Sequence, residues 1–174
     1  MYVVDDADEV VELSAPQSNV GAPLPLVLAD EGTLLLAYLL QEHDPDWDGT
    51  YVTIVGMHHA GRVAIVEFDR HRAFVFGPPN DEAFEGHPLA SRGLEPYGAF
   101  EIRRSSWIRA LERMNRVHEH HDPATFESLR HFVFAFHDST FECVARGFDI
   151  RLAAGSLSDA LRTMETRLLN SASG

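Results

Sequence analysis

The alternation of apolar and polar residues is clearest in residues 131–146, where it predicts a β-hairpin. Successive side chains of a strand point to opposite faces of a sheet, so one register must suit the whole strand pair. Pairing Phe136 with Phe141 across the turn brings phenylalanines of both strands onto one face and sets Phe134 opposite Cys143. We therefore expect an apolar hairpin that forms part of the core.

Further apolar runs, separated by glycine, proline and acidic residues, predict strands in much of the chain. They comprise residues 26–28, 34–40, 51–57, 63–68, 73–76, 99–103 and 148–152. The segment 34–40 also has the composition of a helix, but its short length and the preceding turn favour a strand. Residues 69–72 are expected to form a turn that sets Phe68 opposite Ala73, so that the two flanking strands make a second hairpin.

Helical patterns occur in the C-terminal half of the chain. One helix is expected to begin at Ser105 or Ser106, and a short one at Pro123, where proline suits the first turn. Ser156 begins the last helix, and Asp159 follows it at capping-box spacing. The expected buried stripes are Trp107, Leu111 and Met114 in the first helix and Leu157, Leu161, Met164 and Leu168 in the last.

These elements predict an α+β protein with a largely antiparallel sheet of about seven or eight strands and two or three helices in the C-terminal half. Residues 24–170 are expected to form one domain, because a chain of 174 residues can bury one sizeable core. Residues 1–23 are an acidic lead-in, which either contains a short strand near residues 10–13 or is loosely attached.

Composition narrows the classes of function. The net charge of −13 argues against binding to nucleic acid or anionic lipid, and it allows a basic protein partner or a cationic ligand. The chain has no apolar run of membrane-spanning length and no export signal at its start, so we expect no membrane association. A single cysteine excludes an intramolecular disulfide and fits a cytoplasmic location.

The sequence contains no lysine, so all 14 of its basic residues are arginines. The ordinary cause of such a bias is the codon usage of a GC-rich genome. Whatever its cause, the lack of lysine excludes Schiff-base chemistry, pyridoxal phosphate held by a lysine, and the phosphate-binding lysine of a Walker A loop. We therefore expect no organic cofactor.

The turn of the predicted hairpin gathers polar residues that could carry chemistry. His137, Asp138 and Ser139 are the residue types of a nucleophilic triad, but consecutive residues point in different directions. Asp138 and Ser139 therefore either hydrogen-bond the turn itself or bind a ligand. His137 stands at the end of a strand beside a carboxylate, which suits acid–base catalysis at neutral pH.

Glu142 is expected on the hairpin face opposite the phenylalanines. If helices cover that face, a buried carboxylate needs a partner. The nearest candidates are Arg130, Arg146 and His131. Glu142 is then either one half of a structural ion pair or a general base in a cleft.

The single cysteine and the histidine-rich linker also raise chemical hypotheses. Cys143 is either a small hydrophobic residue of the core or a nucleophile, and a nucleophile needs a polar, partly open site. His118, His120 and His121 lie close together in a linker, where exposure to solvent is the simplest explanation. No motif brings three or four metal ligands together, so we expect no metal site.

Residues 78–97 are the longest irregular stretch, and long loops in compact domains are often functional. Within this loop His87 stands between a glycine and a proline, which restricts its backbone and would present its side chain rigidly. Asn80, Asp81 and Arg92 add further polar groups. The alternative is that glycine and proline simply shape a surface loop.

Two classes of function fit these observations. The first is a protein that binds a compact polar or cationic ligand between the 78–97 loop and the hairpin turn, either without catalysis or as a cofactor-independent hydrolase, lyase or isomerase. Its catalytic candidates are His87, His137, Glu142 and Asp81, and its ligand-binding candidates are Asn80, Arg92, Asp138 and Ser139. The second is an acidic interaction module of the immunity or inhibitor kind that binds a basic protein. Titratable groups around one pocket would favour the first class, and a flat carboxylate face the second.

Overall fold

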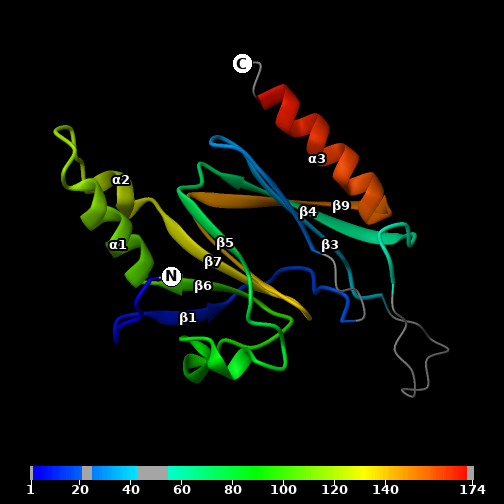
Figure 1. Ribbon diagram of the computed structural model, residues 1–174, viewed down its shortest axis with the longest axis horizontal. Helices are drawn as coiled ribbons and strands as arrows, with labels where there is room; N and C mark the ends of the chain where they lie inside the picture. Colours follow the sequence, from blue (N-terminus) through cyan, green and yellow to red (C-terminus); the bar gives the residue numbers. More distant parts are fainter. Residues whose placement is uncertain (1, 21–24, 43–54, 172–174) are drawn as a thin grey trace.

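The computed structural model of this protein describes residues 2–20, 25–42 and 55–171 (Figure 1). These residues form an α+β fold with nine strands in two antiparallel sheets and three α-helices in the C-terminal half. The expectation of a single sheet of seven or eight strands is wrong. The strands divide between a five-stranded and a four-stranded sheet, because a chain with this many apolar strand residues buries more of them between two sheets than on one.

The elements follow one another along the chain in this order. The strands are β1 (Glu9–Glu12), β2 (Leu26–Ala29), β3 (Leu34–Leu39), β4 (Gly61–Asp69), β5 (Ala73–Gly77), β6 (Ala99–Arg103), β7 (Arg130–Ala135), β8 (Thr140–Ala145) and β9 (Gly147–Gly155). The helices are α1 (Ser106–Asn115), α2 (Ala124–Glu127) and α3 (Leu157–Ser171), with two 3-10 turns, η1 (Phe84–Gly86) and η2 (Ala90–Arg92), in the long loop. The sheet orders are β1-β6-β7-β8-β5 and β2-β3-β4-β9. The strand expected over residues 51–57 lies mainly outside the described residues, and residues 55–57 are not in a strand.

The strands β4 and β5 do not pair with each other, so the second expected hairpin is wrong. The chain turns sharply at Arg70, whose φ of 47° lies in the left-handed region, and β5 crosses to the other sheet. There it pairs with β8, which sets Phe76 opposite Phe141. The strand β4 pairs with β9 instead, which sets Phe68 opposite Phe148. Both β4 and β5 thus pair with apolar strands from the C-terminal part of the chain and not with each other.

The phenylalanine-rich hairpin forms as β7 and β8, with its two faces as expected and its register shifted. Phe134 lies opposite Phe141, so the predicted partner of Phe141 is wrong by two residues. The amide of Phe136 donates a hydrogen bond to the carbonyl of Ser139 at 2.8 Å, which makes the turn tighter than the expected one. An even shift keeps every side chain on its face, so Cys143 is still buried beside the phenylalanines.

The two sheets pack face to face on a core rich in aromatic residues. The buried residues of this core are Leu34, Leu36, Tyr38, Leu40, Ala64, Val66, Phe68, Ala99, Phe132, Phe134, Phe136, Phe141, Cys143 and Ala145. Phe68 of β4 lies at its centre, with its ring 5.3 Å from that of Phe141 and 6.0 Å from that of Phe134. These contacts join the sheets, since β4 belongs to one and β7 and β8 to the other.

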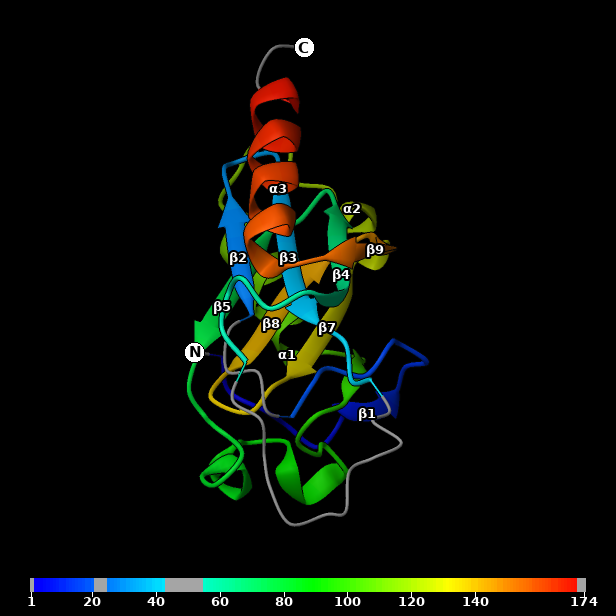
Figure 2. The same cartoon turned by 90° about the vertical axis from the view of Figure 1, so that its right-hand side faces the viewer.

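The helix α3 covers the outer face of the four-stranded sheet, where it contacts β2, β3 and β4 (Figure 2). Its start is the expected capping box, because the Ser156 amide donates to Asp159 Oδ2 at 3.0 Å and the Asp159 amide donates to Ser156 Oγ at 3.2 Å. Leu157 and Met164 are buried as expected. No helix within the described residues is long and apolar enough to cross a membrane.

The outer face of the five-stranded sheet is covered by α1 and α2 at one end and by the loop that carries η1 and η2 at the other. Ser105 caps α1, since its hydroxyl accepts a hydrogen bond from the Ile108 amide at 3.3 Å. Trp107 is buried as expected, but Met114 is 72% exposed, so its assignment to the buried stripe is wrong. The spacing of apolar residues identifies the side of the helix that faces the sheet. It does not show how far the sheet extends beneath the helix.

The acidic lead-in is attached to the five-stranded sheet. Its strand β1 pairs with β6 and forms one edge of that sheet. Asp5 forms an ion pair with Arg109 at 2.6 Å, and Asp8 Oδ1 accepts a hydrogen bond from the Ser106 amide at 2.5 Å. Several carboxylates of the lead-in are therefore already bound to the first turns of α1.

Candidate functional site

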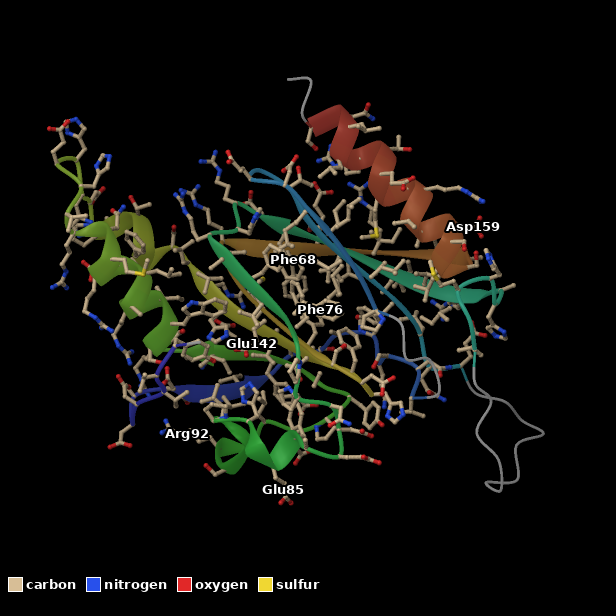
Figure 3. All side chains as sticks on the ribbon, in the orientation of Figure 1. Phe68, Phe76, Glu85, Arg92, Glu142 and Asp159 are labelled. Atoms are coloured by element: carbon tan, nitrogen blue, oxygen red, sulfur yellow. The ribbon has the colours of Figure 1, made fainter. Side chains whose placement is uncertain are left out.

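A buried hydrogen-bonded group, here called the Glu142 cluster, joins Glu142 of β8, which is labelled in Figure 3, to Tyr2, His87 and His131. Glu142 points to the outer face of the sheet, as expected, and its side chain is only 6% exposed. Its Oε1 lies 3.2 Å from His87 Nε2. Its Oε2 lies 3.0 Å from His131 Nε2 and 2.8 Å from the Tyr2 hydroxyl.

The surrounding hydrogen bonds assign the protons of both histidines. The Leu89 amide donates to His87 Nδ1 at 3.1 Å, so a neutral His87 carries its proton on Nε2 and donates it to Glu142. The carboxylate of Glu142 can only accept, so a neutral His131 carries its proton on Nε2, and its Nδ1 accepts the hydroxyl proton of Ser105 at 3.0 Å. The Nε2 proton of His131 is therefore also donated to Glu142.

These hydrogen bonds keep Glu142 ionised in spite of its burial. Loss of water raises the pKa of the carboxyl, but the hydrogen bonds from His131, His87 and Tyr2 outweigh this effect and lower the pKa to about 2. Burial and the adjacent carboxylate raise the pKa of Tyr2 well above its usual range. The His131 ring is further held by edge-on contacts with the rings of Tyr2 and Trp107.

The geometry of the Glu142 cluster makes it a structural element. Three donors occupy the two carboxylate oxygens, and the side chain of His87 is only 2% exposed. The cluster joins the lead-in and the long loop to the sheet, since Tyr2 comes from the first and His87 from the second. Of the expected partners only His131 is present, because Arg130 forms an ion pair with Glu101 instead.

A second polar group, the Tyr97 cluster, joins Tyr97 and Asp81 of the long loop to His137 at the hairpin turn. The Tyr97 hydroxyl donates to Asp81 Oδ2 at 2.5 Å. His137 Nδ1 lies 3.0 Å from both the Tyr97 hydroxyl and Asp81 Oδ2. The side chain of His137 is 41% exposed, so this cluster, unlike the Glu142 cluster, is open to solvent. The two expected catalytic histidines thus belong to two different clusters.

The contacts within the Tyr97 cluster keep the Tyr97 hydroxyl protonated and the Asp81 carboxyl ionised. Burial and the hydrogen bond to Asp81 raise the pKa of Tyr97 to about 12. The hydrogen bond from Tyr97, with a further contribution from His137, lowers the pKa of Asp81 against an opposing effect of burial. At neutral pH Tyr97 therefore acts as a hydrogen-bond donor.

The backbone around Tyr97 is strained and closely packed. Its φ of 61° lies in the left-handed region, which is costly for a residue with a side chain and is common at functional sites. At the next position, a Cβ atom on Gly98 would lie 2.5 Å from the ring of Phe100. Glycine is thus the residue that lets the loop approach the sheet at position 98.

A cavity of about 520 Å³, here called the edge cavity, lies beside Tyr97. Its wall is formed by residues within 12–18 at and after the end of β1, by residues within 93–100 from the long loop into β6, and by the end of β7, with Tyr38 of β3 on the side of the other sheet. Carboxylate side chains come from Glu12 and Glu95. The residues of the wall include no arginine and no histidine among those that the structure describes.

The wall of the edge cavity also contains a buried hydroxyl without a partner. Ser18 is 7% exposed, and its Oγ has no hydrogen-bond partner among the described residues. Tyr38, by contrast, donates its hydroxyl proton to the carbonyl of Pro16 at 3.0 Å. Buried polar atoms in folded proteins are nearly always hydrogen-bonded, so Ser18 marks a position that a ligand or a water molecule would complete.

The expected ligand-binding residues have local structural contacts or lie at the hairpin turn. Asn80 Oδ1 accepts a hydrogen bond from the Ala83 amide at 3.1 Å. Arg92 donates to two backbone carbonyls of the lead-in, at 2.5 and 2.9 Å. Asp138 is exposed, and Ser139 is buried with its hydroxyl unpaired within the described part of the chain. None of these four side chains belongs to the wall of the edge cavity.

The cysteine and the linker histidines form no evident reactive site. Cys143 is fully buried, and burial followed by the charge of Glu142 raises the pKa of its thiol well above the ordinary value. His121 of the linker contacts Glu112 and Asn115 at 3.0 and 2.9 Å. Among residues 2–20, 25–42 and 55–171, no group of three or more histidine, cysteine or acidic side chains could hold a metal ion.

Sequence reasoning missed the residues that form the wall of the cavity. Glu12, Ser18 and Tyr38 come from segments far from the long loop and have no motif. Tyr97 is different, because it stands in a Pro-Tyr-Gly sequence where a bulky residue between two turn-forming residues is unusual. That local pattern is the one signal that could have drawn attention to this site.

Comparisons with known proteins add no relationship to these observations. A scan of protein-family models, a search of curated proteins and a search of solved structures each found no match to this chain.

Proposed function

We propose that this protein binds a compact organic cation in the edge cavity. The observation that carries the proposal is the composition of the wall, in which carboxylate and aromatic side chains surround about 520 Å³ of space. The class of ligand is the one expected from the sequence. The site lies beside the expected cleft, at the end of the long loop, and is bounded by the lead-in and the sheets.

The size of the cavity suits a small ligand. Binding sites for small molecules usually enclose about 300–1,000 Å³. The edge cavity falls in the lower half of this range, which fits a metabolite-sized ligand better than a peptide or a nucleotide chain. Its wall comes from four separate segments of the chain, so a bound ligand would stabilise their arrangement.

The charge of the wall favours a cation. Glu12 and Glu95 contribute carboxylates, and neither forms an ion pair with a described residue. Arginines elsewhere neutralise many of the other carboxylates, as Arg109 does for Asp5. Both glutamates are exposed to solvent, so a cation at the cavity would add an ion pair to a solvated carboxylate, in a chain whose net charge is −13.

Aromatic residues provide the second feature of a cation site. Tyr38, Tyr97 and Phe136 are among the wall residues. An organic cation against an aromatic ring gains about 0.5–2 kcal/mol, and sites for quaternary ammonium groups commonly combine such rings with a carboxylate. The unpaired hydroxyl of Ser18 could accept a hydrogen bond from an ammonium or guanidinium group.

Binding of choline, tetramethylammonium and agmatine by the purified protein would test the proposal. We expect at least one of these cations to raise the thermal midpoint and to give a saturable isothermal titration. The uncharged isostere of choline, in which carbon replaces the quaternary nitrogen, should bind at least about tenfold more weakly. Equal binding of choline and its isostere, or no binding of any of the three cations, would refute the proposal.

Substitutions in the wall would place the binding in the edge cavity. Glu95→Gln and Glu12→Gln each remove one charge, so each should weaken binding about five- to tenfold. Glu85→Gln is a matched control, because Glu85 is an exposed residue of η1 (Figure 3) that does not belong to the wall of the cavity. Equal affinity in all three variants would exclude this cavity as the site.

A second candidate function, acid–base catalysis on the bound ligand, is supported by the Tyr97 cluster. A phenol that retains its proton, a carboxylate and a half-exposed imidazole meet beside the cavity. Acetonyltrimethylammonium, a quaternary cation with acidic carbon-bound protons beside a carbonyl group, can be incubated in deuterated water with and without the protein and followed by proton NMR. Faster exchange of a carbon-bound proton with wild-type protein, lost in His137→Gln, would support catalysis, and exchange no faster than without protein would argue against it.

The alternative of an acidic interaction module has less support. A flat carboxylate face is its main requirement, and the lead-in is the most acidic part of the sequence. There Asp5 is paired with Arg109, Asp8 with a backbone amide of α1, and Glu9 with Arg104. These contacts reduce the negative charge that a basic partner could use.

A further inference from the structure

We propose that β5 pairs with the β5 strand of a second copy of this chain, in antiparallel orientation across a two-fold axis. The two five-stranded sheets would then form one continuous sheet. The proposal concerns a surface that is separate from the edge cavity and does not depend on the proposed ligand.

The strand β5 has a free edge. It ends the five-stranded sheet and pairs only with β8, so alternate backbone amides and carbonyls along its other side lack sheet partners among the described strands. Figure 2 shows β5 at the left margin of the molecule. Such an edge is a template for pairing with another strand.

The side chains of β5 are unusually apolar for an exposed edge. Phe74, Val75 and Phe76 are 38%, 37% and 42% exposed. Edge strands are ordinarily protected by charged side chains, by proline or by a bulge. These three positions contain no charged residue and no proline. Phe74 and Phe76 face the side of the sheet that carries the core phenylalanines, but they project beyond the cover of the four-stranded sheet.

The other edge strands differ from β5 in this respect. The strand β1 has glutamate at both ends, and β9 carries the charged residues Asp149 and Arg151, although its residues 152–154 are apolar and exposed. The side chains of β2 are all partly covered. Of the edge strands in the described part of the chain, β5 is therefore the one whose exposed residues include two phenylalanines.

The sequence of β5 fits pairing with itself. Antiparallel pairing about Val75 sets Val75 opposite its own copy on one face. On the other face it sets Phe74 of each chain opposite Phe76 of its partner, and aromatic pairs of this kind are favourable across strands. A second copy of the chain thus satisfies both faces of the strand with identical residues.

The charges that flank β5 also favour this orientation. Arg70 and Arg72 precede the strand, are exposed and form no ion pair within the described residues. Glu82 follows the strand in the sequence, is exposed and forms no ion pair within the described residues, whereas Asp81 is held by Tyr97 and His137. An antiparallel arrangement brings the basic flank of each chain to the same end as the acidic flank of the other, whereas a parallel arrangement would bring like charges together.

Analytical ultracentrifugation of wild-type protein over a dilution series would test the proposal. We expect a mass that rises with concentration from 19.4 kDa to twice that value. Val75→Lys should remain at the monomer mass, because a lysine at the edge opposes strand pairing. Leu152→Lys is the matched control, since Leu152 is 47% exposed on β9, and it should still dimerise.

A second measurement needs no variant and remains decisive if Val75→Lys does not fold. Hydrogen–deuterium exchange of wild-type protein should show that amides of 73–77 become more protected as concentration rises, whereas those of β9 do not. A monomer at every concentration, a dimer retained by folded Val75→Lys, or protection confined to another strand would each overturn the proposal.

Discussion

The replacement of Glu142 by glutamine is the most direct test of the buried cluster, because it keeps the shape of the side chain and removes its charge. The carboxylate accepts from His87, His131 and Tyr2, whereas a glutamine has one acceptor oxygen and one amide group that donates. At least one of the three donors would then face another donor. A hydrogen bond to a charged group contributes about 1.5–3 kcal/mol, so we expect Glu142→Gln to lower the free energy of unfolding by about 3 kcal/mol near neutral pH.

The same hydrogen bonds also make the stability of the protein depend on pH. The pKa of Glu142 is about 2 in the folded protein, where its ordinary value is 4.5. Because the folded pKa is the lower one, the stabilisation is fully present above about pH 4.5 and is lost as the pH falls towards about 2. At 1.36 kcal/mol for each pKa unit, this difference corresponds to about 3 kcal/mol.

Denaturant unfolding of wild type and Glu142→Gln at about pH 7 and about pH 3 would measure both quantities. The stability gap between the two proteins should narrow at the lower pH, because only the wild type has a carboxylate to protonate. Glu85→Gln is the control, since Glu85 is exposed, and it should show no gap at either pH. A gap that is absent at neutral pH, or that does not change with pH, would refute this account of the cluster.

Three further predictions follow from packing and from the two clusters. Phe134→Ala should cost about 3–5 kcal/mol through the cavity it leaves, and a denaturant midpoint close to wild type at unchanged m-value would contradict this. Gly98→Ala should cost about 1–3 kcal/mol, because the new methyl group meets the ring of Phe100, and an unchanged thermal midpoint would mean that the ring moves freely. His87→Gln should lower the thermal midpoint clearly, since His87 is buried against a charge, whereas His137→Gln should barely change it; equal shifts would be inconsistent with two separate clusters.

The sequence determined the local features of the fold. Strand periodicity placed Cys143 on the phenylalanine face and Glu142 on the other, and both assignments are confirmed although the register is shifted. The capping box at Ser156 is also confirmed. These features depend on residues close together in the chain, so the local pattern contains the information needed to predict them.

The sheet to which each strand belongs was decided by tertiary structure. The spacing around residues 69–72 suits a hairpin as well as a crossing between sheets. The difference comes from Phe148 and Phe141, which offer partners to β4 and β5 in separate sheets. Competition between such pairings depends on the packing of the whole core, which a single segment does not reveal.

The candidate site shows the same division. The sequence identified Glu142, His87, His137 and Asp81 as chemically interesting, but only the folded chain assigned them to two clusters with different exposure. The edge cavity combines segments that are distant in the sequence, from residues 12–18 to the end of β7. Periodicity fixes the side of an element that a residue occupies. Which distant groups meet there depends on the packing of all the elements together, so tertiary structure alone decided the partners of Glu142 and the position of the cavity.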